Sequence, residues 1–329
     1  MSCVLLVRFS SIGDVLLTTT LVRALRARHQ DARLVFVTKR AMAPLVADNP
    51  HLSEVVALEP EESVTALARR LTALAPTRGL DLHGSLRSAA LRLLVRCRWQ
   101  GYAKWKLARG VLIATKIDLY RRLVPVAERY FAAAAGFDAR PDGRPPQFFL
   151  GAGPRARVAG WIAERGLDGA PLAVLAPGAA HFTKRWPPAH WTALAERLRG
   201  RGFGLAVAGG PEDRSAAQPL APLAAIAAGE FSLQETGALL ASARVVVSGD
   251  TGVMHMATGV GTPVVALFGP TVRQFGFFPY AAPAVVLERN LACRPCSSMG
   301  GPRCPMGHHR CLVDISPDDV AAAAERLVA

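Results

Sequence analysis

The stretch that decides the fold is Ser248-Gly249-Asp250-Thr251-Gly252-Val253-Met254-His255-Met256-Ala257, followed by Gly261-Thr262-Pro263-Val264-Val265-Ala266-Leu267-Phe268-Gly269-Pro270-Thr271. An apolar run, residues 245–247, leads into a polar turn that opens a short helix, and a second apolar run follows within a few residues. This order is typical of a parallel βαβ unit. Because a helix N-terminus presents free backbone N–H groups, the stretch predicts a phosphate site. The alternative is an ordinary turn without a phosphate site, in which Gly252 serves only to form the turn.

The same alternation of strand and helix runs through both halves of the chain. In the first half, strands are expected at residues 4–8, 34–38, 55–58 and 79–82, and helices at 15–28, 41–48 and 64–74. A stretch rich in proline and glycine, residues 139–154, interrupts the pattern and indicates an interdomain linker.

The second half repeats the pattern. Strands are expected at residues 172–175, 204–208, 245–247 and 264–268, and helices at 188–199, 233–242 and 320–328, the last capped by Ser316 with Pro317 at its start. The sequence therefore predicts an α/β protein with two doubly wound, Rossmann-like domains, residues 1–150 and 151–329, facing each other across a cleft. Ligands of such sheets bind outside the carboxyl ends of the strands.

Composition narrows the class of protein. The chain has 329 residues, 51% of them hydrophobic and 19% charged, which is typical of a globular protein and excludes a disordered one. No apolar stretch approaches the roughly 18 residues of a membrane span, and the first residues lack the basic region of a signal peptide. A cytoplasmic location is expected.

The positive charge is concentrated in one segment. Of the formal net charge of +14, residues 85–130 carry a large part, because eleven basic residues there face only two acidic ones. Three interpretations of this basic segment are possible: a solvated helix face, a nucleic-acid surface, or a site for an anionic substrate or membrane. Nucleic acid is not expected, because no helix-turn-helix, zinc-finger or RNA-recognition signature is present.

Three further polar motifs follow predicted strands. The first is Ser10-Ser11-Ile12-Gly13-Asp14, which would place the Asp14 carboxylate at the mouth of the cleft. The alternative is that Asp14 only caps the helix that follows. In the loop of residues 177–187, Lys184 and Thr183 suit a diphosphate, although the loop could also be ordinary surface. In Gly209-Gly210-Pro211-Glu212-Asp213, the carboxylate of Glu212 could accept hydrogen bonds from a ribose.

In order and spacing, these four motifs resemble glycosyltransferase family 9, the heptosyltransferases of lipopolysaccharide core assembly. The resemblance runs over nearly the whole chain and includes Asn49-Pro50, Asp81-Leu82-His83-Gly84-Ser85-Leu86-Arg87-Ser88 and Cys293-Arg294-Pro295-Cys296. It implies the GT-B fold and an inverting transfer that needs no metal. No Asp-x-Asp pair, the usual holder of a metal-bound diphosphate, occurs in the chain.

The resemblance also implies roles for individual residues. Asp14 matches the general base and Lys184 the lysine on the donor phosphates. The other expected donor-binding residues are Thr183, Glu212, Asp250, Thr251, Gly252 and His255, and the expected acceptor-binding residues are Ser11, Gly13, His83, Arg87, Lys104 and Lys106. The chain departs from some members in having His181-Phe182 before a single Thr183, where those members have two hydroxyl residues.

The implied function is heptose transfer from an ADP-sugar to an anionic, lipid-linked core oligosaccharide at the inner membrane surface, without a cofactor. One alternative is a family 9 transferase with another nucleotide sugar or acceptor glycan. Another is an inactive scaffold that binds anionic glycolipid, but a scaffold would not need the base Asp14 or the cation of Lys184. A nicotinamide-dependent oxidoreductase is disfavoured because its glycine fingerprint is missing.

Four cysteines near the C-terminus leave two interpretations open. Cys293, Cys296, Cys304 and Cys311 follow the spacing C-x2-C-x7-C-x6-C, with two histidines nearby. Such spacing is compatible with tetrahedral zinc. Reduced structural thiols are the favoured interpretation, since structural disulfides are rare in the cytoplasm.

Overall fold

The computed structural model describes residues 2–329 and divides the chain into two compact units. Unit 1 comprises the residues up to Lys104 together with Val124–Phe149, and unit 2 comprises Trp105–Leu123 together with Leu150–Ala329. The change from one unit to the other near residue 150 falls inside the predicted linker. The segment Trp105–Leu123, which the sequence analysis included in the first domain, is grouped with unit 2.

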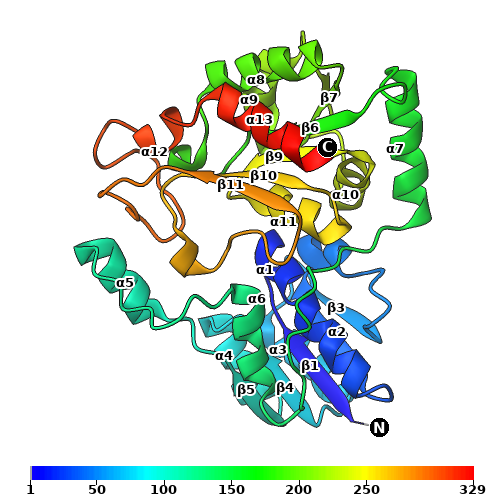
Figure 1. Ribbon diagram of the computed structural model, residues 1–329. Coiled ribbons are helices and arrows are strands. Elements are labelled where there is room, and N and C mark those ends of the chain that lie inside the picture. The colour runs from blue at the N-terminus through cyan, green and yellow to red at the C-terminus, as the bar shows by residue number, and fades with distance from the viewer. Residues whose placement is uncertain (1) are drawn as a thin grey trace. The chain divides into compact units, whose positions relative to one another are not determined.

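Unit 1 is built on a parallel sheet of order β3-β2-β1-β4-β5. Its strands are β1 (Cys3–Val7), β2 (Arg33–Lys39), β3 (Glu54–Leu58), β4 (Arg78–Asp81) and β5 (Arg98–Gly101). Every residue of β1 is buried, as expected for a central parallel strand that is covered on both faces. The helices are α1 (Ile12–Leu17), α2 (Thr19–Arg28), α3 (Val64–Ala73), α4 (Leu86–Leu94) and α6 (Val126–Arg129), with 3-10 turns at Arg40–Leu45 and Tyr130–Ala134 (Figure 1).

Two helices of unit 1 differ from the prediction. The helix expected at residues 15–28 is interrupted at Thr18, whose hydroxyl donates to the carbonyl of Val15 at 2.6 Å. Such side-chain bonds compete with the helical ladder. The helix expected at residues 41–48 is the 3-10 turn Arg40–Leu45, which contains Pro44. Proline lacks the N–H that an α-helical turn needs at that position.

Unit 2 is built on a second parallel sheet, of order β11-β10-β9-β6-β7-β8. Its strands are β6 (Leu172–Ala176), β7 (Gly204–Val207), β8 (Ala225–Ile226), β9 (Val245–Gly249), β10 (Val264–Phe268) and β11 (Ala284–Glu288). The helices are α5 (Lys106–Thr115), α7 (Ala152–Glu164), α8 (Pro188–Gly200), α9 (Arg214–Ala217), α10 (Leu233–Ser242), α11 (Gly252–Val260), α12 (Arg310–Val313) and α13 (Pro317–Val328).

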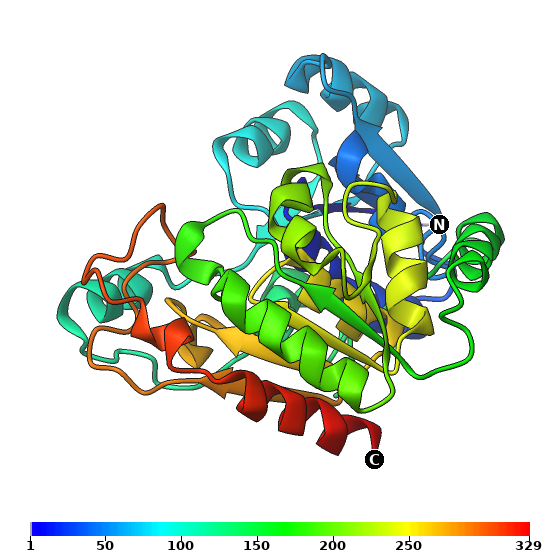
Figure 2. The same cartoon turned by 90° about the horizontal axis from the view of Figure 1, so that it is seen from above.

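Helices cover both faces of this second sheet. Figures 1 and 2 both show α8 and α13 side by side over one face, and α11 lies on the other. The core beneath α8 and α13 contains Trp186 and Trp191, and the Trp186 ring N–H donates to the carbonyl of Ile315 at 3.0 Å. The expected cap of α13 is present, since the Ser316 hydroxyl accepts from the N–H of Asp319.

Helix α5 is held within unit 2 by contacts of Arg109, inside the helix, and of Lys116, its C-cap residue. The ammonium group of Lys116 donates to the carbonyl of Pro295 at 2.7 Å. The guanidinium of Arg109 lies 5.5 Å from the centre of the Phe275 ring. These contacts explain why α5 is grouped with unit 2 although its sequence neighbours belong to unit 1.

The two strand orders each contain one point at which the winding reverses, between β1 and β4 in unit 1 and between β6 and β9 in unit 2. Doubly wound sheets bind ligands at such points, outside the carboxyl ends of the strands. All four motifs of the sequence, and the Asp81–Ser88 motif, follow strands of these two sheets. The predicted α/β class with two Rossmann-like sheets is confirmed. Among residues 2–329, none of the helices is long and apolar enough to cross a membrane.

Candidate active site

In unit 1, Asp14 lies in α1, just beyond the carboxyl end of β1. One carboxylate oxygen is 2.6 Å from Nη2 of Arg8 and accepts from the hydroxyl of Ser11 at 2.9 Å. The other oxygen accepts from the hydroxyl of Tyr130 at 2.9 Å. The side chain remains 16% exposed. Three donors thus fix the carboxylate while part of it stays open to an incoming group.

The partners of Asp14 are themselves held rigidly. Arg8 is buried and also donates to the carbonyls of Ser10 and Leu82. Tyr130 is fully buried, and burial, reinforced by the nearby Asp14 carboxylate, raises the pKa of its phenol well above the usual value. The phenol is therefore protonated and able to donate at neutral pH.

Neither Arg8 nor Tyr130 was among the site residues predicted from the sequence. Arg8 carried a weak signal, as a cation at the end of an apolar strand, but Tyr130 is 116 residues away from Asp14 along the chain.

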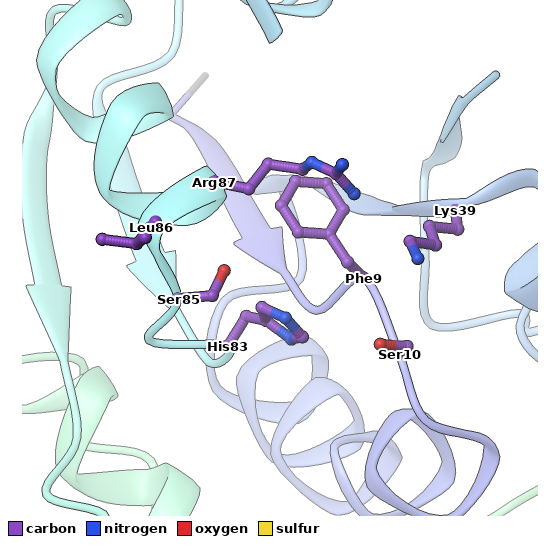
Figure 3. A pocket seen from close by; sticks show the side chains of 7 residues that line it. All are labelled: Phe9, Ser10, Lys39, His83, Ser85, Leu86 and Arg87. Carbon is purple, nitrogen blue, oxygen red and sulfur yellow. The ribbon is translucent and has the colours of Figure 1, made fainter. Parts of the chain in front are cut away.

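A pocket of about 430 Å³ lies in the same unit, beside the carboxyl ends of β1, β2 and β4 (Figure 3). Arg87 extends across the ring of Phe9, and Lys39 approaches from the opposite side. The full lining is Phe9, Ser10, Lys39, His83, Ser85, Leu86 and Arg87. Two cations and a histidine around an aromatic ring suit an anionic sugar. Lys39 was not predicted.

His83, one of the predicted acceptor residues, packs edge-on against Phe9 with ring centres 5.5 Å apart. Burial, and then the positive charges of Arg8 and Lys104, lower the pKa of His83 to about 4. The ring is therefore neutral at physiological pH, and the positive charge of the pocket comes from its lysine and arginine.

The turn that carries His83 is built around Asp81. Its carboxylate accepts from the backbone N–H groups of His83 and Gly84 at 3.0 and 2.8 Å, and from the hydroxyl of Ser88 at 3.0 Å. Lys104 donates to the carbonyl of Gly84 at 3.3 Å. Asp81 and Lys104 thus contribute to the shape of this turn.

The remaining predicted acceptor residues have different environments. Ser11 is the N-cap residue of α1, and Gly13 is buried within that helix. Arg87 belongs to α4 and lines the pocket. Lys106 is the first residue of α5 and falls in unit 2, so the structure does not group it with the other five.

In unit 2, Lys184 and Asp250 form an ion pair beyond the carboxyl ends of β9 and β10. The lysine Nζ is 2.7 Å from Oδ2 of Asp250 and 3.0 Å from its backbone carbonyl oxygen. Thr271, after β10, donates its hydroxyl to the same carboxylate oxygen at 2.7 Å. The two charged side chains are only 14% and 8% exposed. The ammonium group is thereby fixed beside the start of α11.

Two glycines allow this close approach. A Cβ on Gly249 would lie 3.1 Å from the carbonyl oxygen of Lys184, and one on Gly269 would lie 3.1 Å from that of Thr183. The loop that carries the lysine therefore rests directly on the ends of β9 and β10. Glycine at these two positions has a packing function that the sequence analysis did not identify.

The start of α11 carries the other predicted donor residues. Thr251 is its N-cap residue, but its hydroxyl lies 3.1 Å from that of Ser248 instead of capping the helix. Gly252 begins the helix. His255 is buried one turn later, with its ring centre 6.4 Å from that of Phe277. The structure thus brings Lys184, Asp250 and the N-terminus of α11 together.

Thr183 and Glu212, the two remaining predicted donor-binding residues, lie in different environments. The Thr183 hydroxyl accepts from the N–H of Gly301 at 2.8 Å and donates to its carbonyl, so it is engaged within the protein. Glu212 is exposed. The packed carboxylate of its loop is Asp213, which accepts from the N–H of Gly210 at 3.0 Å and whose pKa is raised by burial.

Asp213 was not selected from the sequence. A Cβ on Gly178 would fall 2.0 Å from one of its carboxylate oxygens. This contact joins the loop after β6 to the loop after β7, so Asp213 packs these two loops against each other.

In the cysteine-rich tail, four thiols lie close enough to interact electrostatically, those of Cys293, Cys296, Cys304 and Cys311. The sulfur of Cys293 is 4.0 Å from Nε2 of His308. Burial raises the pKa of Cys296, and that of Cys311 to about 11, so these thiols are protonated at neutral pH. Within residues 2–329, no group of three or more His, Cys, Asp or Glu side chains is arranged to hold a metal ion.

Comparison with known proteins assigns the family. The family model of "Glycosyltransferase family 9 (heptosyltransferase)" matches residues 64–306. Lipopolysaccharide heptosyltransferase 2 of Salmonella typhimurium is 26% identical over 348 residues, which cover 96% of each chain.

Two solved structures have the same fold. A family 9 glycosyltransferase from Veillonella parvula has a TM-score of 0.85 at 22% identity, covering 99% of this chain and 97% of its own. The Escherichia coli ADP-heptose heptosyltransferase II has a TM-score of 0.77 at 24% identity, covering 100% of this chain and 98% of its own. The fold is GT-B, and the chain belongs to glycosyltransferase family 9, the heptosyltransferases of lipopolysaccharide biosynthesis.

Proposed function

We propose that this protein transfers a heptose from an ADP-sugar to an anionic, lipid-linked core oligosaccharide, with inversion at the anomeric carbon and without a metal ion. In this proposal unit 2 binds the donor and unit 1 the acceptor. The observation that carries it is the ion pair of Lys184 with Asp250 at the start of α11, next to the reversal point of its sheet. The solved relative from Escherichia coli, which is named for ADP-heptose, supports the choice of nucleotide.

On the donor side, two positive groups would meet the diphosphate. The ammonium of Lys184 is close to the N-terminus of α11, where backbone N–H groups and the helix dipole favour negative charge. As the bond to the sugar breaks, negative charge grows on the departing ADP. Lys184 and the helix would stabilise this charge without reorganisation, because both are already in place. This arrangement removes the need for a metal cation.

On the acceptor side, Asp14 would act as the general base. It would take the proton from the acceptor hydroxyl as that oxygen attacks the anomeric carbon, and this direct displacement inverts the configuration. The ion pair with Arg8 and the hydrogen bond from Tyr130 would hold the carboxylate in the attacking geometry. The pocket beside it, with Lys39 and Arg87, would receive an acidic group of the acceptor.

The proposed place of action is the cytoplasmic face of the inner membrane, in peripheral contact with it, since the acceptor is lipid-linked. The relative from Salmonella typhimurium supports this choice of acceptor, because it is named as a lipopolysaccharide heptosyltransferase.

The test is a thermal-shift series with ADP, UDP and NAD. Ligand that binds only the native state raises the melting temperature, by mass action. We expect stabilisation by ADP and none by UDP or NAD, followed by turnover with ADP-heptose and a lipid-linked acceptor. Stabilisation by UDP alone would instead support the alternative of another nucleotide sugar. Binding of acceptor without turnover of any nucleotide sugar would support the scaffold.

A further inference from the structure

Helix α4 carries leucines on its solvent side. Leu86 is 92% exposed, Leu93 is 85% exposed and Leu94 is 45% exposed, whereas Ser88 and Leu91 are buried. Leu86 and Leu93 are seven residues apart, so they lie on the same face of the helix. A surface helix normally presents polar side chains on that face. The apolar face of α4 is therefore a feature that folding of unit 1 does not explain.

The same helix is basic and has no acidic residue. Its sequence, Leu-Arg-Ser-Ala-Ala-Leu-Arg-Leu-Leu, contains Arg87 and Arg92, and Arg96 follows its end. All three arginines are exposed. Large apolar side chains bordered by arginines are the composition of helices that lie in the interface of an anionic bilayer.

We propose that the exposed face of α4, defined by Leu86, Leu93 and Leu94, docks on the surface of a bilayer that contains anionic lipid. The leucines enter the boundary between headgroups and acyl chains, and the arginines contact the headgroup phosphates. A second copy of this chain is a poorer occupant. A two-fold symmetric contact would place the same arginines against each other, and like charges repel.

The pocket beside α4 connects this docking with binding of the acceptor. Leu86 and Arg87 are consecutive, yet Figure 3 shows Leu86 pointing away from Phe9 while Arg87 extends over it. Leu86 thus borders both the apolar face and the cationic pocket, and Arg87 extends into the pocket. Docking through α4 would bring that pocket to the height of the headgroups, where a lipid-linked acceptor presents its sugars. This last step rests on the proposed function, whereas the docking itself does not.

The direct test is cosedimentation with vesicles. We expect the protein to bind vesicles of phosphatidylethanolamine and phosphatidylglycerol, to bind phosphatidylcholine vesicles weakly, and to lose binding as salt rises toward 0.1 M and above, where the screening length falls to about 10 Å. The double variant Leu93→Gln/Leu94→Gln should lower the vesicle partition constant by roughly tenfold or more. Arg96→Gln should lower it by about fivefold.

The matched control is Met306→Gln, which changes a 61% exposed apolar side chain in unit 2 and should leave the partition constant unchanged. Equal vesicle binding by wild type and the double variant would overturn the proposal. A second result would also overturn it: the wild type does not bind vesicles, sediments as a dimer, and becomes a monomer in the double variant Leu93→Gln/Leu94→Gln. The exposed face of α4 would then be an interface between two copies of the chain.

A kinetic readout separates docking from catalysis. With acceptor embedded in vesicles, the double variant should have a raised apparent KM and an unchanged kcat. With a deacylated, water-soluble acceptor, its KM should equal that of the wild type. Absence of vesicle binding together with normal transfer would refute the docking alone. Vesicle binding without any transfer would refute the proposed function and leave the docking in place.

Discussion

At the scale of single residues, the two charged centres share one design, in which an ionic side chain is fixed before substrate arrives. Asp14 is surrounded by an arginine, a phenol and a hydroxyl, all of them donors. Lys184 is held by a carboxylate that a threonine also contacts. Fixed groups of this kind stabilise developing charge without the cost of reorienting at the moment of reaction.

Asp14→Asn should abolish proton abstraction while keeping the shape of the side chain. Turnover should fall by roughly 10²- to 10⁴-fold, which is the usual contribution of a general base, and ADP affinity should stay nearly unchanged. Turnover and ADP affinity are measured separately, by steady-state kinetics and calorimetry. Ser11→Ala, which removes only one of the three donors, is the control and should cost less than about tenfold. Wild-type turnover in Asp14→Asn would remove this residue from the mechanism.

Lys184→Ala should weaken ADP binding by about 1.5–3 kcal/mol, the range of a charge-assisted hydrogen bond. It should also lower the free energy of unfolding, because the buried Asp250 carboxylate loses its cation. Thr271→Val is the matched control: it removes a neutral donor to the same carboxylate and should leave ADP affinity nearly intact. The ADP affinity of both folded variants is measured by calorimetry. If Lys184→Ala binds ADP as tightly as the wild type does, Lys184 has a structural role only.

At the scale of elements, the strands were the most predictable part of the chain. The predicted strand at 264–268 and helix at 233–242 coincide with β10 and α10. The helices α4 and α5 were not predicted, since their segment was interpreted through its charge alone. Helix α7 begins at Ala152, inside the predicted linker, because glycine and proline near a helix start do not prevent the helix from continuing.

The same contrast holds for the site. Its motif residues could be predicted because parallel strands align their carboxyl ends on one edge of a sheet. Tyr130 could not, since it reaches Asp14 through tertiary packing from 116 residues away. Lys39 ends β2 and Asp213 lies in the loop after β7, so the same rule applies to both, but no local pattern distinguished them from their neighbours.

Gly249→Ala tests the packing of the lysine loop on β9. The new Cβ would lie 3.1 Å from the carbonyl oxygen of Lys184, so the loop must move by a few tenths of an ångström. Since a displacement of 1 Å in an active site can lower the rate 10²-fold, turnover should fall by about three- to tenfold. Gly261→Ala is the control, because this glycine at φ +85° has open space around it. That change should cost about 1 kcal/mol of stability and leave turnover unchanged, as steady-state kinetics and denaturation can show.

At the scale of the whole molecule, metal independence is a prediction that elemental analysis can test. Protein purified without a histidine tag should contain no stoichiometric metal, and EDTA should leave activity unchanged. The physical reason is that Lys184 and the N-terminus of α11 supply positive charge for the departing diphosphate, and that within residues 2–329 no group of three or more His, Cys, Asp or Glu side chains is arranged to hold a metal ion. One equivalent of zinc or iron, released together with a fall in melting temperature, would contradict the prediction and assign the cysteines to a structural metal site.

The stability of the folded chain should depend on pH through His83. Its pKa is about 4 in the folded protein, against 6.5 for an exposed histidine, because burial and nearby cations oppose protonation. Between these two values the unfolded state binds a proton that the folded state does not, so stability is lost as the pH falls from about 6.5 to about 4. The loss from this residue is at most about 3 kcal/mol, and less where solvent screens the ring.

The comparison with His83→Gln isolates this contribution, because glutamine does not titrate and the other ionisable groups are common to both proteins. Urea denaturation across this pH range should show a steeper decline in the free energy of unfolding for the wild type than for the variant. Parallel curves would mean that His83 is protonated equally in both states. The pocket would then carry a third positive charge at acidic pH, and its selectivity for an anionic group would rise as the pH fell.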